Sequence, residues 1–128
     1  MLTKRRLDAL TYEIIGGAIE VHKIIGRGLL ESIYHQCLKE NQYIGSRYLS
    51  GLTELKIPVV YKGKQLDMDF RCDLFVENSV VVELKSVKEF IPAYEAQLLT
   101  YMKLLRCPKG VLINLTVQIY LKKGKRPL

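Results

Sequence analysis

The sequence predicts an α/β fold in which helices flank a mixed central β-sheet. Apolar residues recur at helical spacing near the N-terminus, apolar and polar residues alternate from residue 55 onward, and a further helical segment precedes two short apolar stretches. The chain has 128 residues, which suits one domain with a single core. We therefore expect residues 1–128 to form a single domain that ends in a mobile basic tail, residues 122–128.

Three helices are expected. Apolar residues three or four apart predict the first over about residues 4–25, and Gly-Arg-Gly at 26–28 ends it. The second helix follows directly, and its apolar stripe consists of Leu30, Ile33, Tyr34, Cys37 and Leu38. The third starts at Pro92, because proline is favoured in a first helical turn, and runs to about Leu105.

Alternating apolar and polar residues predict the strands. Gly and Ser punctuate residues 41–53, so this segment is expected to be a loop. Turns are expected at Gly63 and at residues 77–79. The expected strands cover residues 55–61, 65–76, 80–87, 111–115 and 117–121.

The hairpin around Asn78 has a register that can be predicted. With residues 77–79 as the loop, one side of the hairpin is wholly apolar, and a shift of one residue would mix the two sides. The apolar side then pairs Val76 with Val80, Leu74 with Val82 and Cys72 with Leu84. The other side pairs Phe75 with Val81, Asp73 with Glu83 and Arg71 with Lys85.

This register places two carboxylates directly opposite each other. The Cβ atoms of Asp73 and Glu83 would lie about 5 Å apart, where like charges repel unless a cation or a proton stands between them. Oxygen ligands suit Mg²⁺ or Mn²⁺, and Lys85 would stand beside the metal to hold a water or to stabilise negative charge. The alternative is a solvated face on which Glu83 pairs with Lys85 or Arg71.

The amino-acid composition indicates the kind of partner and the cellular compartment to expect. A net charge of +7 and a pI of about 9.4 favour an anionic partner such as nucleic acid. Three cysteines without metal-ligand spacing indicate reduced thiols in a cytoplasmic protein, and no apolar run is long enough to cross a membrane. His22 and His35 have no carboxylate or cysteine at ligand spacing, so both are expected to be structural.

Three short motifs resemble those of a known group of proteins. The pattern D…ExK, formed by Asp73, Glu83 and Lys85, resembles that of the PD-(D/E)XK nuclease superfamily. "GLLESIY" at 28–34 resembles the GxxExxY signature of one family in that superfamily, and "EAQLLTYMKLL" at 95–105 resembles the RecB-like QxxxY element. The proline that often precedes the first aspartate of the superfamily is absent here.

The resemblance implies a restriction-endonuclease-like core with the order α-α-β-β-β-α-β-β. It also implies metal ligation by Asp73, Glu83 and the Leu84 carbonyl, with Glu31 reaching the metal directly or through water. Lys85 would be the catalytic lysine, and Gln97 is counted with Lys85, Asp73, Glu83 and Glu31 among the catalytic residues. Gln97 and Tyr101 would support the site or contact a phosphate, and Tyr34 would be a supporting residue. The residues by themselves leave other interpretations open. Glu31 and Gln97 could be surface residues, and both tyrosines could be packing residues.

The resemblance thus implies a Mg²⁺- or Mn²⁺-dependent nuclease that hydrolyses phosphodiester bonds, with little sequence specificity and with DNA as the expected partner. One alternative is a non-catalytic module that binds nucleic acid or regulates a partner. Another is a different enzyme acting on a nucleotide or another phosphoester. The sequence leaves a homodimer or a protein partner open.

Overall fold

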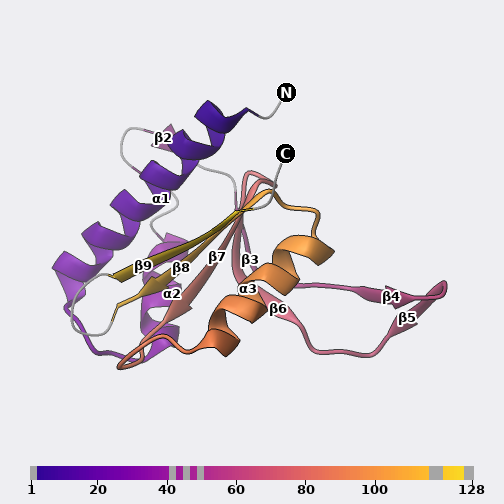
Figure 1. The fold of residues 1–128 in the computed structure, drawn as a ribbon. Helices are drawn as coiled ribbons and strands as arrows, with labels where there is room; N and C mark the ends of the chain where they lie inside the picture. The colour runs from indigo at the N-terminus through magenta and orange to yellow at the C-terminus, as the bar shows by residue number, and fades with distance from the viewer. Residues whose placement is uncertain (1–2, 41–42, 45–46, 49–50, 116–119, 126–128) are drawn as a thin grey trace.

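The computed structural model describes residues 3–40, 43–44, 47–48, 51–115 and 120–125 (Figure 1). The helices are α1 (Lys4–Ile25), α2 (Glu31–Glu40) and α3 (Pro92–Leu104). The strands are β1 (Tyr43–Ile44), β2 (Arg47–Tyr48), β3 (Gly51–Lys56), β4 (Val59–Tyr61), β5 (Lys64–Leu66), β6 (Arg71–Val76), β7 (Val80–Lys85), β8 (Lys109–Asn114) and β9 (Tyr120–Lys125).

A five-stranded sheet of order β3-β6-β7-β8-β9 forms the centre of the molecule. Strands β7 and β8 are parallel because α3 connects them, and the other neighbours are antiparallel. Figure 1 shows α3 on one side of the sheet and α1 with α2 on the other. The predicted α/β class, a mixed central sheet flanked by helices, is confirmed.

The sheet has a hydrophobic core on each face, so its central strands are buried on both sides. Residues of even number on β7, such as Val82, pack with α1 and α2, while the odd-numbered Val81 packs with α3. The same alternation holds on β6, where Leu74 and Phe75 belong to opposite cores. In β7, and in β6 from Leu74 onward, residues of odd number therefore face α3, whereas Cys72 packs on the α3 side despite its even number.

The two strands predicted at 55–61 and 65–76 are each broken in the structure. The sheet strand β3 ends at Lys56, because Pro58 has no N–H to continue the ladder. Residues 59–61 and 64–66 form a separate two-stranded sheet, and residues 67–70 are irregular before β6 begins at Arg71. Uninterrupted strands over these ranges were therefore a wrong prediction.

Two further expectations are wrong in part. The predicted loop at 41–53 contains β1, β2 and the start of β3, whose pairing depends on distant residues such as Val76. The predicted tail is a strand as far as Lys125, because β9 pairs with β8 and satisfies its outer edge. The remaining tail residues 126–128, and the first residues of the expected strand 117–121, lie outside the described residues.

The structure also describes the state of the cysteines and the character of the helices. Cys37, Cys72 and Cys107 are all free thiols. Over the described part of the chain, no helix has both the length and the apolar character needed to cross a membrane.

Candidate active site

The predicted pair of carboxylates lies at one end of the β6–β7 hairpin. The regular ladder has the predicted register over Val76–Val80, Phe75–Val81 and Leu74–Val82, and it ends there. Beyond it the side chains take over the hydrogen bonds: the Asp73 N–H donates to Glu83 Oε1 (3.0 Å), and the Leu84 N–H donates to Asp73 Oδ2 (2.7 Å). Each carboxylate thus holds the backbone of the opposite strand.

This arrangement corrects the outer part of the predicted register. The β6–β7 ladder does not continue to pair Cys72 with Leu84 or Arg71 with Lys85. On the other edge of β6, Cys72 and Arg71 pair with Leu55 and Lys56 of β3. Cys72 also packs in the core on the α3 side, whereas Leu84 packs in the other core. The two strands can separate here because carboxylate oxygens replace the backbone acceptors of the ladder.

The acidic side chains are shielded from solvent to different degrees, and Glu83 lies on the face of the sheet that α3 covers. Glu83 is 4% exposed and Asp73 is half-buried. Burial, together with the Asp73 charge, raises the pKa of Glu83 to about 8. Burial also raises the pKa of Asp73, although the Leu84 N–H and the nearby His35 and Lys85 partly oppose this. The alternative of a solvated acidic face is therefore wrong.

Arg71, one of the two residues that could have paired with Glu83 on a solvated face, has another partner. Arg71 pairs with Asp69 at 3.0 Å, on the exposed side of the strand. Burial and the charge of Asp73 both raise the pKa of Glu83, so the ionisation of both carboxyls at once is disfavoured. In the metal-free protein a shared proton thus relieves the repulsion between them.

Lys85 is held by residues of α3. Its Nζ donates to Gln97 Oε1 (3.4 Å) and lies 4.6 Å from the centre of the Tyr94 ring. Gln97 Nε2 in turn donates to the Tyr101 hydroxyl at 3.0 Å, as residues four apart on a helix can. Burial and the charge of Glu83 raise the pKa of Tyr101, so this hydroxyl keeps its proton. The structure thus brings Lys85, Gln97 and Tyr101 into one chain of contacts.

The segment "GLLESIY" is fixed at the same end of the sheet. Tyr34 is fully buried, and its hydroxyl donates to the Gly26 carbonyl (2.9 Å) and accepts the Leu29 N–H (3.0 Å). The Leu29 carbonyl accepts the hydroxyl of Ser86, which directly follows Lys85. Gly28, with a φ of +75°, donates its N–H to the end of β8 at Leu115 (3.2 Å).

Glu31 begins α2 immediately after this anchored segment and is exposed. Within the described residues, no hydrogen bond or ion pair joins it to Asp73 or Glu83. The structure therefore places Glu31 at the same end of the sheet as Lys85 but does not bring it into contact with the acidic pair.

Two residues near Asp73 were not predicted to lie at the site: His35 was expected to be structural, and Glu54 was not singled out. His35 of α2 places Nε2 3.1 Å from the Asp73 carbonyl oxygen and Nδ1 3.7 Å from Glu54 Oε1. Glu54 has a φ of +51° and lies between Thr53 and Leu55, which pair with Leu74 and Cys72 on either side of Asp73. One signal was available for His35: it follows Tyr34 directly and so lies beside a motif residue on the helix.

The acidic pair fits a divalent cation of the oxygen-preferring kind. Asp73, Glu83 and the Leu84 carbonyl can together supply oxygen ligands, which suit Mg²⁺ or Mn²⁺. Within the described residues no group of three or more His, Cys, Asp or Glu side chains could hold a metal, so Asp73 and Glu83 are a pair of ligands without a third side chain of these kinds beside them. A cation would replace the proton that the two buried carboxyls otherwise need.

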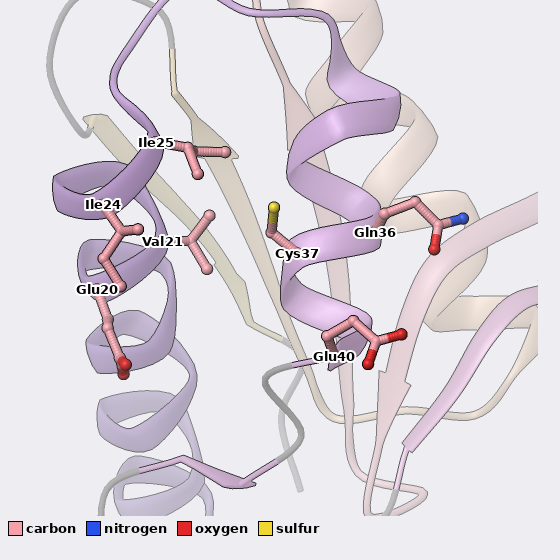
Figure 2. Close-up of a pocket in the computed structure, with 7 residues that line it drawn as sticks. All are labelled: Glu20, Val21, Ile24, Ile25, Gln36, Cys37 and Glu40. Carbon is pink, nitrogen blue, oxygen red and sulfur yellow. The ribbon is translucent and has the colours of Figure 1, made fainter.

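A cavity of about 380 Å³ lies elsewhere, between α1 and α2 (Figure 2). Its lining is mostly apolar and includes Ile24 of α1 and Cys37 of α2. None of its lining residues belongs to the predicted site, so the cavity is separate from the carboxylate pair.

The comparisons with known proteins agree with this geometry. The family model described as "PD-(D/E)XK nuclease superfamily" matches residues 8–126. The chain belongs to the PD-(D/E)XK nuclease superfamily. Asp73 and Glu83, whose spacing with Lys85 resembles the D…ExK pattern of this superfamily, are brought together by the β6–β7 hairpin. No curated protein matches the chain.

One solved structure shows the fold of this PD-(D/E)XK protein in a larger chain. The crystal structure of SSO0001 is similar, with a TM-score of 0.60 and 22% sequence identity. The match covers 96% of the present chain and 62% of SSO0001. The chain thus spans less than two thirds of the length of that protein, and the likeness concerns the fold.

Proposed function

We propose that this PD-(D/E)XK protein is a metal-dependent nuclease that hydrolyses phosphodiester bonds with little sequence specificity. The observation that carries the proposal is the pair of shielded carboxyls, Asp73 and Glu83, each of which accepts a backbone N–H of the opposite strand, with Lys85 held beside them by Gln97 of α3. Two buried carboxyls with raised pKa values cost stability unless a cation binds, and such costs are typical of functional sites. Membership of the superfamily supports a nuclease in particular.

Asp73, Glu83 and the Leu84 carbonyl would hold Mg²⁺ or Mn²⁺. When bound, the metal would polarise the scissile phosphate and lower the pKa of a bound water. Glu31 would complete the ligand set, directly or through a water. Its place at the start of α2, next to the segment anchored on Ser86, supports this role.

Lys85 would be the catalytic lysine, orienting the attacking water or neutralising charge that develops on the phosphate. Its ammonium is positioned by Gln97 and the Tyr94 ring, and Tyr101 fixes the Gln97 amide. Gln97 and Tyr101 would thus support the site through Lys85. Tyr34 would support it by fixing the backbone that leads to Glu31.

The partner would be nucleic acid, with DNA as the expected substrate. The net charge of +7 supports binding to a phosphate backbone. We also assign the protein to the GxxExxY family within the superfamily, because Gly28, Glu31 and Tyr34 carry its signature and Tyr34 is fully buried.

A cleavage assay tests the proposed function. It would use single- and double-stranded DNA and RNA with Mg²⁺, Mn²⁺ or EDTA, and would compare wild type with Lys85→Ala and Glu83→Ala. Lys103→Ala, an exposed lysine late in α3, is the matched control. We expect metal-dependent cleavage that both site variants lose and the control retains.

Two results would contradict the proposal. Cleavage retained by Lys85→Ala and Glu83→Ala would place the activity elsewhere or in a contaminant. Nucleic-acid binding without cleavage, unchanged by metal and by both substitutions, would instead favour a non-catalytic binding or regulatory module.

A further inference from the structure

A two-stranded hairpin projects from the edge of the molecule (Figure 1). It consists of β4 and β5, which pair only with each other and lie outside the central sheet. Its turn residues Lys62 and Gly63 both have positive φ values, +51° and +77°. Such a two-residue turn matches the twist of the strands and gives the hairpin a defined shape.

The hairpin exposes both cationic and apolar side chains. Lys62 and Lys64 flank its tip, and no acidic residue occurs between Lys56 and Leu66. Tyr61 is 63% exposed and Val60 is 61% exposed, with the Lys62 ammonium 5.5 Å from the centre of the Tyr61 ring. An isolated two-stranded ribbon gains little stability in water, so its exposed apolar surface indicates a binding role.

The hairpin leads directly into the candidate active site. It joins the end of β3 to the start of β6, and Asp73 is the third residue of β6. Asp73 lies nine positions after Lys64, and at about 3.3 Å per residue this gives a reach of at most about 30 Å. That is less than one turn of B-form DNA, which is about 34 Å.

We propose that the β4–β5 hairpin is an arm that binds double-stranded DNA within one helical turn of the bond held at Asp73 and Glu83. Its lysines would contact backbone phosphates, and the major groove of B-form DNA admits a two-stranded ribbon. The deep, narrow major groove of double-stranded RNA does not admit one. This inference rests on the proposed nuclease function for its placement of the substrate, and it names the substrate as duplex DNA.

A binding measurement tests the arm independently of cleavage. The probe is a fluorescein-labelled duplex DNA of 30 base pairs in EDTA, with anisotropy recorded at several salt concentrations. The variant is Lys62→Gln/Lys64→Gln, and the control Lys23→Gln/Lys39→Gln removes the same charge from exposed positions on α1 and α2. Thermal unfolding would verify that both double variants remain folded.

Loss of two phosphate contacts lowers the slope of log affinity against log salt by about 1.8. Between 200 and 50 mM salt the affinity of wild type would therefore rise about tenfold more than that of the arm variant. We expect this change for duplex DNA in the arm variant and a smaller change in the control.

Several outcomes would contradict the proposal that the β4–β5 hairpin binds duplex DNA. These are an unchanged slope, an equal change in the control, equal changes with single-stranded DNA or duplex RNA, and no duplex binding by wild type. A shift from dimer to monomer in the arm variant, with the DNA slope unchanged, would show that the hairpin binds a second copy. If the arm variant changes the salt slope but the wild type cleaves no substrate, the hairpin binds DNA as proposed and the proposed nuclease function is wrong.

Discussion

Replacing Glu83 by glutamine should stabilise the metal-free protein at high pH. Glu83 is 4% exposed and faces Asp73, and its pKa is raised from 4.5 to about 8. A carboxyl whose pKa is higher in the folded state stabilises the fold when protonated. This stability is fully present below pH 4.5 and is lost as the pH rises through about 8.

The magnitude follows from the pKa change. A rise from 4.5 to about 8 corresponds to about 5 kcal/mol of folding free energy lost once Glu83 is ionised. Glutamine has nearly the same shape, can still accept the Asp73 N–H and carries no charge. We expect Glu83→Gln to exceed wild type by up to about 5 kcal/mol at pH 9 and to differ little at pH 4.

Urea denaturation in EDTA at pH 4, 6, 8 and 9 would measure these free energies of unfolding. Glu89→Gln, at an exposed position shortly after β7, is the control and should show no comparable dependence. A stability gain that is the same at all four pH values would refute the reasoning. Mg²⁺ added at pH 8 should stabilise wild type more than Glu83→Gln.

Three further predictions concern neighbouring parts of the structure. Gly110→Ala should lower the free energy of unfolding by about 1–3 kcal/mol in urea denaturation, because the added Cβ would lie 2.7 Å from Met102 Sδ. Tyr101→Phe should lower kcat while leaving the Mg²⁺ affinity measured by calorimetry unchanged, because it removes the partner of Gln97 and not a metal ligand; weaker Mg²⁺ binding would contradict this. Tyr34→Phe should cost about 1–3 kcal/mol in the same denaturation assay, because it leaves two backbone groups before α2 unpaired; a change below about 0.5 kcal/mol would contradict the bond pair.

Much of the candidate site could be predicted because it depends on local periodicity. The turn at 77–79 and the alternation of the hairpin set Asp73 opposite Glu83, and the ladder has that register up to Leu74–Val82. The four-residue spacing of Gln97 and Tyr101 likewise places both side chains on one helix face, and in the structure they contact each other.

The breaks in the strands were harder to predict. Pro58 marks the break after β3 in the sequence. However, apolar residues continue to alternate across Pro58, so this alternation alone predicted a single strand. The separation of the strands at Asp73 had no such signal. It occurs because side-chain oxygens replace backbone acceptors there.

The sequence by itself thus determined the class of fold, the helices and the pairing of the acidic residues, because residues two, three or four apart share a face by backbone geometry alone. The tertiary structure decided that α3 buries the acidic face, that His35 and Glu54 approach Asp73, and that β9 covers β8. These outcomes depend on contacts between residues far apart in the chain. No local period specifies which distant surfaces meet, and the free energy of packing and of satisfied backbone groups decides it.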